Sequence, residues 1–329
     1  MSVSPERLDL KDRKLLYELD LNSRTPLSKI AKKIGLSPEV VNYRIKRLEK
    51  ENIITQYQVI VNLAALNIIQ FKICLLFQHM TSENFAVILD KVKKMNAVKW
   101  IVSCKGNWDL IISVETDCVE NVDNLKNEII SLFGNNIRNK AISILVEAQT
   151  YFRDYLIPTK DSLSRSRLIM KKDIVKKDKE YVLDDLDIAI LKKLAENARK
   201  SIVEIAAELK QTIRIVNYRI KQLERKKIIL GYKVALNYEK LGIKFFKTFI
   251  YLDNPTKNRL SALTSYLGQN KNVIHDVKVL GNWDLEPEFE VYNEEEFDTI
   301  IKEIKDKFSD IIKEMDIITI SKEHKFVYF

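Results

Sequence analysis

The chain has 329 residues, of which 46% are hydrophobic and 31% charged. This composition is that of a folded globular protein with more than one domain, and only 7 glycines and 6 prolines exclude a fibrous or low-complexity chain. The formal net charge of +9 comes from 55 Lys and Arg against 46 Asp and Glu, and it favours an acidic binding partner.

The cysteines and the apolar runs indicate the compartment. Cys74, Cys104 and Cys118 show neither a CxxC spacing nor a neighbouring histidine, which predicts no metal site and favours reduced surroundings. The N-terminus is too polar for a signal peptide, and no apolar run approaches the roughly 18 residues of a membrane-spanning helix. We therefore expect a cytoplasmic protein without a membrane partner, a metal or a cofactor.

An internal repeat is the most informative feature of the sequence. The strings VNYRIK and GNWDL each occur twice, 175 positions apart, and Leu8 matches Leu183 at the same offset. Because the offset is constant, both copies must contain the same elements in the same order.

The segment between the copies is polar and basic, and two interpretations remain open for it. A solvated tether is preferred, because charge runs usually keep a connection in water. A basic arm that contacts phosphate is the alternative, and it would add affinity for any DNA sequence. The cations of this arm would be Arg165, Arg167, Lys171 and Lys172.

The first third of each copy has the periodicity of three short helices. In copy one, leucines predict a first helix with Asp12 in its first turn, and an apolar stripe predicts a second helix over 26–34. Gly35 offers the left-handed residue that ends a helix, and Ser37 caps a third helix over 38–50.

The third helix has an apolar seam and a polar, largely basic outer face. A helix of this kind after a tight turn fits the major groove, where amide and guanidinium groups read base edges. A three-helix bundle that binds nothing is the alternative. The alternating run of residues 53–61 follows as a strand and favours a winged helix-turn-helix.

The run SRTPLSKIAKKIGLSPEVVNYRIKRLEKENIITQYQVIVN resembles the DNA-binding domain of the Lrp/AsnC (feast/famine) transcription regulators, and GNWD resembles that family's turn motif. The resemblance covers nearly all of copy one. It implies sequence-specific binding of double-stranded DNA, and a ferredoxin-like βαββαβ domain that dimerises and often senses an amino acid. The residues expected to contact DNA are Ser37, Glu39, Asn42, Tyr43, Arg44, Lys46, Arg47, Thr212, Arg214, Asn217, Tyr218, Arg219 and Lys221.

Copy two matches the family more loosely at the turn before its third helix. Lys210 stands where copy one has Gly35, and a lysine in a left-handed conformation costs roughly 1 kcal/mol more than glycine. We therefore expect a turn of different geometry, and DNA binding by this second helix stays open.

The remainder of each copy alternates strand-like and helical runs. In copy one the order βαββαβ covers 70–77, 84–95, 98–104, 110–116, 119–133 and 142–147. The fold class is therefore α+β, with two tandem copies of a winged helix-turn-helix followed by a ferredoxin-like domain. The expected divisions are helix-turn-helix 1 (1–62), sensor 1 (68–157), linker (158–180), helix-turn-helix 2 (181–238) and sensor 2 (243–329).

A βαββαβ domain leaves one sheet face open, and that face has to be covered. The two copies offer each other a cover of the same shape, so we expect an intrachain pseudo-dimer. The resemblance supports this pairing and a further homo-oligomer.

The two GNWD turns have two open interpretations. They are structural if glycine supplies an unusual backbone conformation and aspartate binds its own backbone. Alternatively, as the resemblance implies, they line a pocket for a small effector such as an amino acid. The residues concerned are Gly106, Asp109, Gly281 and Asp284.

The strand after the second GNWD turn, LEPEFEV, carries three carboxylates on one face, at Glu286, Glu288 and Glu290. They bind a cation or an amine, or they are solvated. Solvation is preferred, because no histidine or cysteine accompanies them.

Two other classes compete with the regulator. Siroheme decarboxylases resemble this family, but His79, His275 and His324 are the only histidines and none lies in a motif, so we expect no catalytic residues and no enzyme. An architectural protein that binds DNA without sequence preference is the third class. The effector, the target genes and the sign of regulation stay open.

Overall fold

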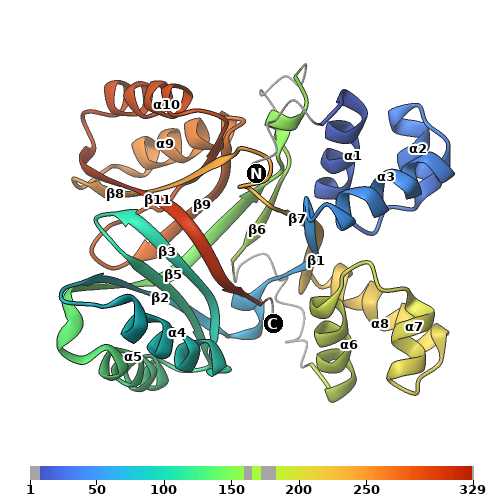
Figure 1. Cartoon of the computed structure of the whole chain (residues 1–329), viewed down its shortest axis with the longest axis horizontal. Coiled ribbons are helices and arrows are strands. Elements are labelled where there is room, and N and C mark those ends of the chain that lie inside the picture. Colours follow the sequence, from blue (N-terminus) through green and yellow to red (C-terminus); the bar gives the residue numbers. More distant parts are fainter. Residues whose placement is uncertain (1–7, 159–164, 172–182, 328–329) are drawn as a thin grey trace. The chain divides into compact units, whose positions relative to one another are not determined.

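The computed structural model describes residues 8–158, 165–171 and 183–327 (Figure 1). The chain forms two compact units, and neither is continuous in sequence. Unit 1 holds both helix-turn-helix copies, and its described residues lie within Met1–Ala65 and Tyr151–Ile243. Unit 2 holds both sensor copies and consists of Leu66–Thr150 and Lys244–Val327.

Unit 1 contains the same three helices twice. Their bounds are α1 (Leu10–Leu21), α2 (Leu27–Ile34) and α3 (Pro38–Lys50) in copy one, and α6 (Asp185–Glu196), α7 (Ile202–Glu208) and α8 (Ile213–Arg225) in copy two. As predicted, Ser37 caps α3, because its side chain accepts a hydrogen bond from the Val40 amide. Thr212 caps α8 in the same way.

The turn before each third helix keeps one geometry in both copies. Gly35 has a φ of 68°, and Lys210 has a φ of 52° at the matched position. The expected change of geometry at this residue is therefore wrong. The lysine adopts the left-handed conformation despite its Cβ, since the two helices that it connects pack as their counterparts do.

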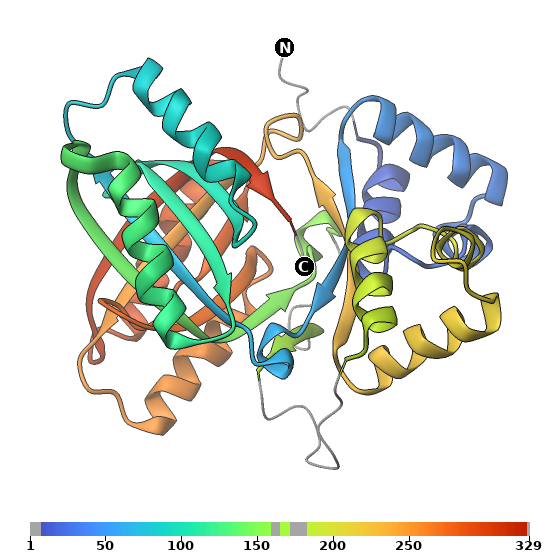
Figure 2. The same ribbon diagram turned by 90° about the horizontal axis from the view of Figure 1, so that it is seen from below.

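The strand after each helix-turn-helix pairs with its counterpart in the other copy. The strands β1 (Ile54–Val61) and β7 (Ile229–Leu236) are antiparallel and form a two-stranded ribbon. The helices of both copies lie on the same side of this ribbon (Figure 2). Helix α1 of copy one packs on β7, and α6 of copy two packs on β1. The predicted wing strands are thus shared between the copies.

Two matched contacts reinforce the ribbon. The guanidinium of Arg24 lies 5.4 Å from the ring centre of Tyr232, and that of Arg199 lies 5.3 Å from the ring centre of Tyr57. Each tyrosine belongs to the copy that does not supply the arginine. These cation–π contacts hold the two helix-turn-helix copies together.

Unit 2 contains the βαββαβ order twice. Copy one has β2 (Ile69–Phe77), α4 (Ser82–Lys94), β3 (Val98–Gly106), β4 (Leu110–Thr116), α5 (Val119–Phe133) and β5 (Ile137–Tyr151). Copy two has β8 (Lys244–Leu252), α9 (Lys257–Gln269), β9 (Val273–Leu280), β10 (Glu288–Val291), α10 (Glu294–Lys307) and β11 (Ile312–Phe326). The remaining elements of the described chain are η2 (Leu63–Leu66), η3 (Gly134–Asn136), η4 (Asp154–Leu156) and β6 (Arg167–Met170), of which η4 and β6 belong to unit 1.

The strands of the two sensor copies close into one barrel. The sheet order is β2-β4-β3-β11-β8-β10-β9-β5-β6, and β5 also pairs with β2, so the ring from β2 to β5 has no free edge. Two antiparallel pairings, β3 with β11 and β5 with β9, join the copies. The copies therefore share hydrogen-bonded edges as well as facing each other.

The alternation of side chains on β2 defines the inside of the barrel. Phe71, Ile73 and Leu75 form one hydrophobic core with residues of α4 and α5, and Figure 2 shows both helices on the outside of the sheet. Lys72 and Cys74 therefore point into the barrel, because neighbouring side chains of a strand face opposite ways. Both are buried. Among the described helices, none is long and apolar enough to cross a membrane.

Candidate nucleic-acid interface and sensor site

The third helix of each copy buries one stripe and leaves the opposite face open. The buried residues are Val41, Ile45 and Leu48 in α3, and Val216, Ile220 and Leu223 in α8. The residues predicted to contact DNA lie outside these stripes. Tyr43, Tyr218, Lys46 and Lys221 are exposed, and Asn42 and Asn217 are half-buried.

Three of the predicted DNA contacts are instead engaged in ion pairs within unit 1. In copy one, Arg44 lies 2.8 Å from both Asp9 and Asp12, and Arg47 lies 2.5 Å from Asp12, which is buried. Hydrogen bonds that Arg44 donates to the two carboxylates raise its pKa. These arginines fasten the first helix to the third, and DNA contact by them stays a prediction.

Copy two repeats this arrangement. Arg219 lies 2.8 Å from Asp184 and 3.4 Å from the buried Asp187. The role of these aspartates was not predicted, because Asp12 was expected only to stabilise the first turn of its helix. A signal was available, because the Asp and Arg pair recurs at the repeat offset.

The N-terminal turns of α3 and α8 differ between the copies. Glu39 is exposed, and a hydrogen bond with the Ser37 side chain lowers its pKa. Arg214 occupies the matched position in copy two and is also exposed. One helix therefore begins with a carboxylate and the other with a guanidinium.

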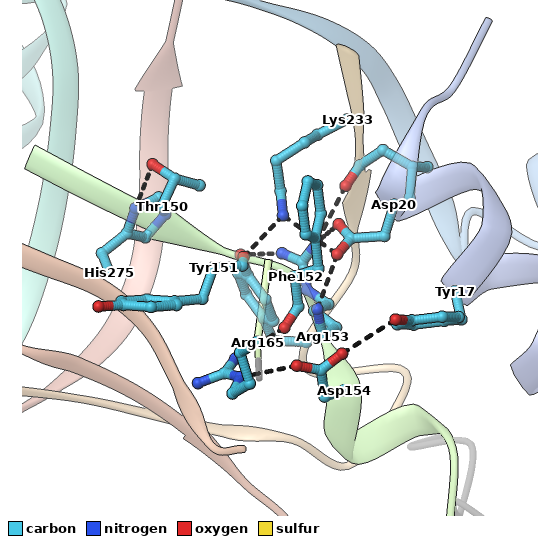
Figure 3. Close-up of polar contacts among 12 residues, drawn as sticks. Tyr17, Asp20, Thr150, Tyr151, Phe152, Arg153, Asp154, Arg165, Lys233 and His275 are labelled. Carbon is cyan, nitrogen blue, oxygen red and sulfur yellow. Dashed lines mark hydrogen bonds and ion pairs between the residues drawn. The ribbon is translucent and has the colours of Figure 1, made fainter. Parts of the chain in front are cut away.

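A buried ionic cluster in unit 1 holds the segment that follows β5 (Figure 3). Asp20 of α1 accepts hydrogen bonds from the Arg153 side chain at 2.6 Å and from Lys233 of β7 at 3.0 Å. All three residues are buried. Burial opposes ionisation of Asp20, but Lys233 and Arg153 outweigh it and lower the pKa of this carboxyl.

The neighbouring Asp154 brings part of the predicted linker into the same cluster. It accepts hydrogen bonds from the Tyr17 hydroxyl at 3.0 Å and from Arg165 at 2.6 Å (Figure 3). Arg165 also donates to the Phe152 carbonyl and is buried, so the interpretation of this residue as a phosphate-binding arm is wrong. Of the other three cations of that arm, Arg167 is exposed, Lys171 is half-buried and Lys172 lies outside the described residues.

In unit 2, the two GNWD turns have the same contacts at the repeat offset. Asp109 accepts a hydrogen bond from the Phe77 amide at 2.7 Å, and Asp284 accepts one from the Leu252 amide at 2.8 Å. These bonds satisfy the backbone at the ends of β2 and β8. Both aspartates thus have a structural contact.

The glycines of these turns allow close approach of the two copies. A Cβ on Gly106 would lie 2.7 Å from the Ile317 carbonyl oxygen, and one on Gly281 would lie 2.6 Å from the Ile142 carbonyl oxygen. The tryptophans of the two turns are buried, with ring centres 6.3 Å apart. The turns therefore join the copies, and effector binding by Gly106, Asp109, Gly281 and Asp284 stays a prediction.

The three carboxylates of the LEPEFEV strand are buried, so the expectation that they are solvated is wrong. Glu286 lies 2.5 Å from Lys72 and 2.7 Å from Lys247, and Glu288 lies 2.8 Å from Lys247. Lys72 and Lys247 occupy matched positions in the two copies. Glu286 and Glu288 are therefore counter-ions of the two lysines inside the barrel, where a single unpaired charge would be costly.

Further hydrogen bonds complete the surroundings of Glu286. The Ser143 hydroxyl donates to it at 2.9 Å, and the Trp283 indole N–H donates at 2.8 Å. Burial opposes ionisation, but Lys247 and Lys72 outweigh it and hold the pKa of Glu286 well below its usual range.

The histidines do not gather into a site. His275 contacts the Thr150 hydroxyl at 3.1 Å (Figure 3), His324 contacts the Ser103 hydroxyl at 2.7 Å, and His79 is exposed. Within the described ranges, no group of three or more His, Cys, Asp or Glu side chains is placed to hold a metal ion.

Comparisons with known proteins agree on the helix-turn-helix copies. Residues 8–55 match a winged helix-turn-helix DNA-binding family, and residues 183–224 match the AsnC-type helix-turn-helix domain. An uncharacterized HTH-type transcriptional regulator of Pyrococcus abyssi is 31% identical over 118 residues, which cover 36% of this chain and 79% of that protein. The HTH-type transcriptional regulator FL11 of Pyrococcus furiosus is 25% identical over 145 residues, which cover 44% and 93%.

Solved structures of the siroheme decarboxylase NirDL resemble the chain over nearly its whole length. One of them has a TM-score of 0.60 and 12% sequence identity over 98% of this chain and 94% of that one. At this identity the likeness concerns the fold alone.

Proposed function

The chain belongs to the Lrp/AsnC family of DNA-binding transcription regulators, and from this premise we propose that it binds one operator through two unlike recognition helices, α3 and α8. The observation that carries the proposal is the β1–β7 ribbon, which ties both helix-turn-helix copies into one unit. One chain then supplies both recognition helices that an operator with two half-sites needs.

The exposed faces of α3 and α8 supply the proposed contacts. An asparagine side chain pairs with adenine through two hydrogen bonds, and a lysine neutralises phosphate or reads guanine. The proposed DNA contacts are Ser37, Glu39, Asn42, Tyr43 and Lys46 in copy one, and Thr212, Arg214, Asn217, Tyr218 and Lys221 in copy two. Arg44, Arg47 and Arg219 position the helices through their aspartates.

Selection of bound sequences from a random DNA pool tests the proposal. We expect two related but unequal half-sites, because Glu39 disfavours phosphate or accepts from cytosine whereas Arg214 favours guanine. Their centres should lie about one helical turn, ~34 Å, or a multiple of it apart. Swapping residues 38–39 with 213–214 should invert the asymmetry. Recovery of no preferred sequence would favour an architectural protein instead.

We propose that the chain regulates transcription without catalysing a reaction. We also propose that it is located in the cytoplasm, where conditions keep its free thiols reduced. The enzyme alternative is tested by the visible absorption spectrum of the purified chain. A bound tetrapyrrole would absorb visible light, whereas the proposed regulator would not.

We also propose that regulation involves a small effector, with the GNWD turns as the expected binding region. A thermal-shift screen of amino acids tests this, because a ligand of the folded state raises the melting temperature. The shift should vanish in Asp109→Ala and in Asp284→Ala, and persist in the control Asp90→Ala on the exposed face of α4. If no amino acid gives a shift, the turns serve structure alone.

A further inference from the structure

Large apolar side chains gather on the exposed faces of the two recognition helices. Of the twelve exposed large apolar residues in the described part of the chain, five lie on α3 or α8. On α8 they are Ile213, Ile215 and Tyr218, which are 53%, 40% and 59% exposed. Single exposed apolar residues are ordinary, but three on one short helix mark a contact surface.

Neither packing nor helix stability explains the two isoleucines. Helix α8 packs through Val216, Ile220 and Leu223, which are buried. β-Branched residues are weaker helix formers than alanine, leucine or lysine, so exposed isoleucines add nothing to the helix itself. Their side chains are therefore available to a partner.

The charges beside the isoleucines indicate what that partner is. Arg214 stands between them in sequence, and Lys221 lies two turns further along α8. Within the described ranges neither cation has a hydrogen-bond or ion-pair partner, in contrast to Arg219. Apolar groups surrounded by free cations fit a DNA groove, where phosphates meet the cations and the thymine methyl is the apolar group on the base edges.

We propose that Ile213 and Ile215 make α8 a reader of thymine methyl groups in the half-site that copy two contacts. This inference rests on the proposed function and goes further, because it names the base and the chemical group that are read.

The matched residues of copy one give that helix a different preference. Pro38 and Val40 replace the two isoleucines, and Glu39 lies between them. Proline and valine offer less apolar surface, and the carboxylate is repelled by phosphate. The thymines should therefore belong to one half-site, and they orient the pseudo-dimer on its operator.

The direct test removes only the methyl group. In an operator obtained by selection, each thymine is replaced singly by deoxyuridine, and dissociation constants are measured for the full chain at fixed salt. We expect a loss of about fourfold per contacted methyl, from the burial of one CH₂-sized group, at one or two thymines of a single half-site. No loss at any thymine would overturn the inference and leave DNA binding intact.

A double variant assigns the effect to the two isoleucines. In Ile213→Ser with Ile215→Ser, thymine and uracil sites should bind equally well. The matched control is Val203→Ser on α7, which removes an exposed apolar side chain away from α8 and should keep the discrimination. Circular dichroism checks that the double variant is folded.

Two outcomes of this experiment contradict the inference. Discrimination that survives in the double variant would mean that other residues read the methyl group. If the double variant still discriminates thymine from uracil but has a different oligomeric state, the two isoleucines contact another protein chain and not DNA. Absence of any selected operator would instead contradict the proposed function, so the two failures are distinguishable.

Discussion

Lys72 and Glu286 meet inside the barrel of unit 2 with nitrogen and oxygen 2.5 Å apart, although 214 positions separate them in the chain. The lysine comes from copy one and the carboxylate from copy two. Lys247 is the repeat counterpart of Lys72, but Ile111 and Ser113 stand where copy two has Glu286 and Glu288. Both lysines therefore pair with carboxylates that only copy two supplies.

The pairing of both lysines with copy-two carboxylates predicts that stability lost by removing Glu286 can be recovered by a carboxylate at the matched position, Ile111. Glu286→Ile should lower the free energy of unfolding by roughly 3–5 kcal/mol, because Lys72 keeps its buried charge without its carboxylate. Adding Ile111→Glu supplies a carboxylate from the pseudo-symmetric strand and should recover part of the loss. Urea unfolding of both variants measures it.

Asp90→Ala is the control, since it removes a carboxylate from an exposed ion pair with Lys94 and should change little. If Ile111→Glu recovers no stability, Glu286 is needed for the packing and hydrogen bonds at its own position, and not as a counter-ion for the two lysines.

The cluster around Asp20 predicts a defined dependence of stability on pH. The pKa of this buried carboxyl is below its usual value of 3.8 in the folded state. Its contribution is therefore present above about pH 4 and is lost as the pH falls through the lowered folded pKa. Asp20→Asn should destabilise the chain at neutral pH and weaken the loss of stability on acidification.

Measuring the free energy of unfolding from about pH 2 to about pH 7 tests this expectation, because it covers the range below about pH 4 where the contribution is lost. The control is Asp123→Asn, which alters an exposed carboxylate on α5. Parallel pH profiles for Asp20→Asn and the unaltered chain would contradict the role assigned to Asp20.

The helix-turn-helix copies were predictable from sequence because their determinants are local. The spacing of Val41, Ile45 and Leu48 sets the buried stripe of α3, and Ser37 marks its first residue. The repeat offset then transfers these assignments to copy two. The turn at Lys210 was misjudged, because an unfavourable propensity of about 1 kcal/mol is outweighed by the packing of the helices around it.

The pairing of the copies and the buried charges could not be predicted in the same way. LEPEFEV has the composition of a solvated strand, and only Lys72 and Lys247 across the barrel make its carboxylates interior residues. The partners are brought together by strand pairing between copies, which no local pattern specifies. Two lysines at matched positions in apolar strands were the available signal.

Strain at Lys210 predicts a stabilising substitution. Its φ of 52° favours glycine, so Lys210→Gly should raise the free energy of unfolding by about 1 kcal/mol. Thermal unfolding measures the change, with Lys32→Gly on α2 as a control that should destabilise a regular helix. A lower stability of Lys210→Gly would mean that the lysine side chain makes a contribution larger than the strain.

The last prediction separates the two kinds of basic residue on α3. Arg44 is tied to Asp9 and Asp12, whereas Lys46 is exposed and has no ion-pair or hydrogen-bond partner among the described residues. Arg44→Ala should therefore lower stability by roughly 1–3 kcal/mol, because the buried Asp12 loses a partner. Lys46→Ala should leave stability unchanged and weaken binding to every DNA sequence.

Salt dependence distinguishes the two residues further. If Lys46 neutralises one phosphate, its removal lowers the slope of log affinity against log salt by about 1. At a temperature where Arg44→Ala is fully folded, its slope should equal that of the unaltered chain, since Arg44 acts through the position of α3. A lower slope in Arg44→Ala would show that the arginine exchanges its aspartates for phosphate when DNA binds.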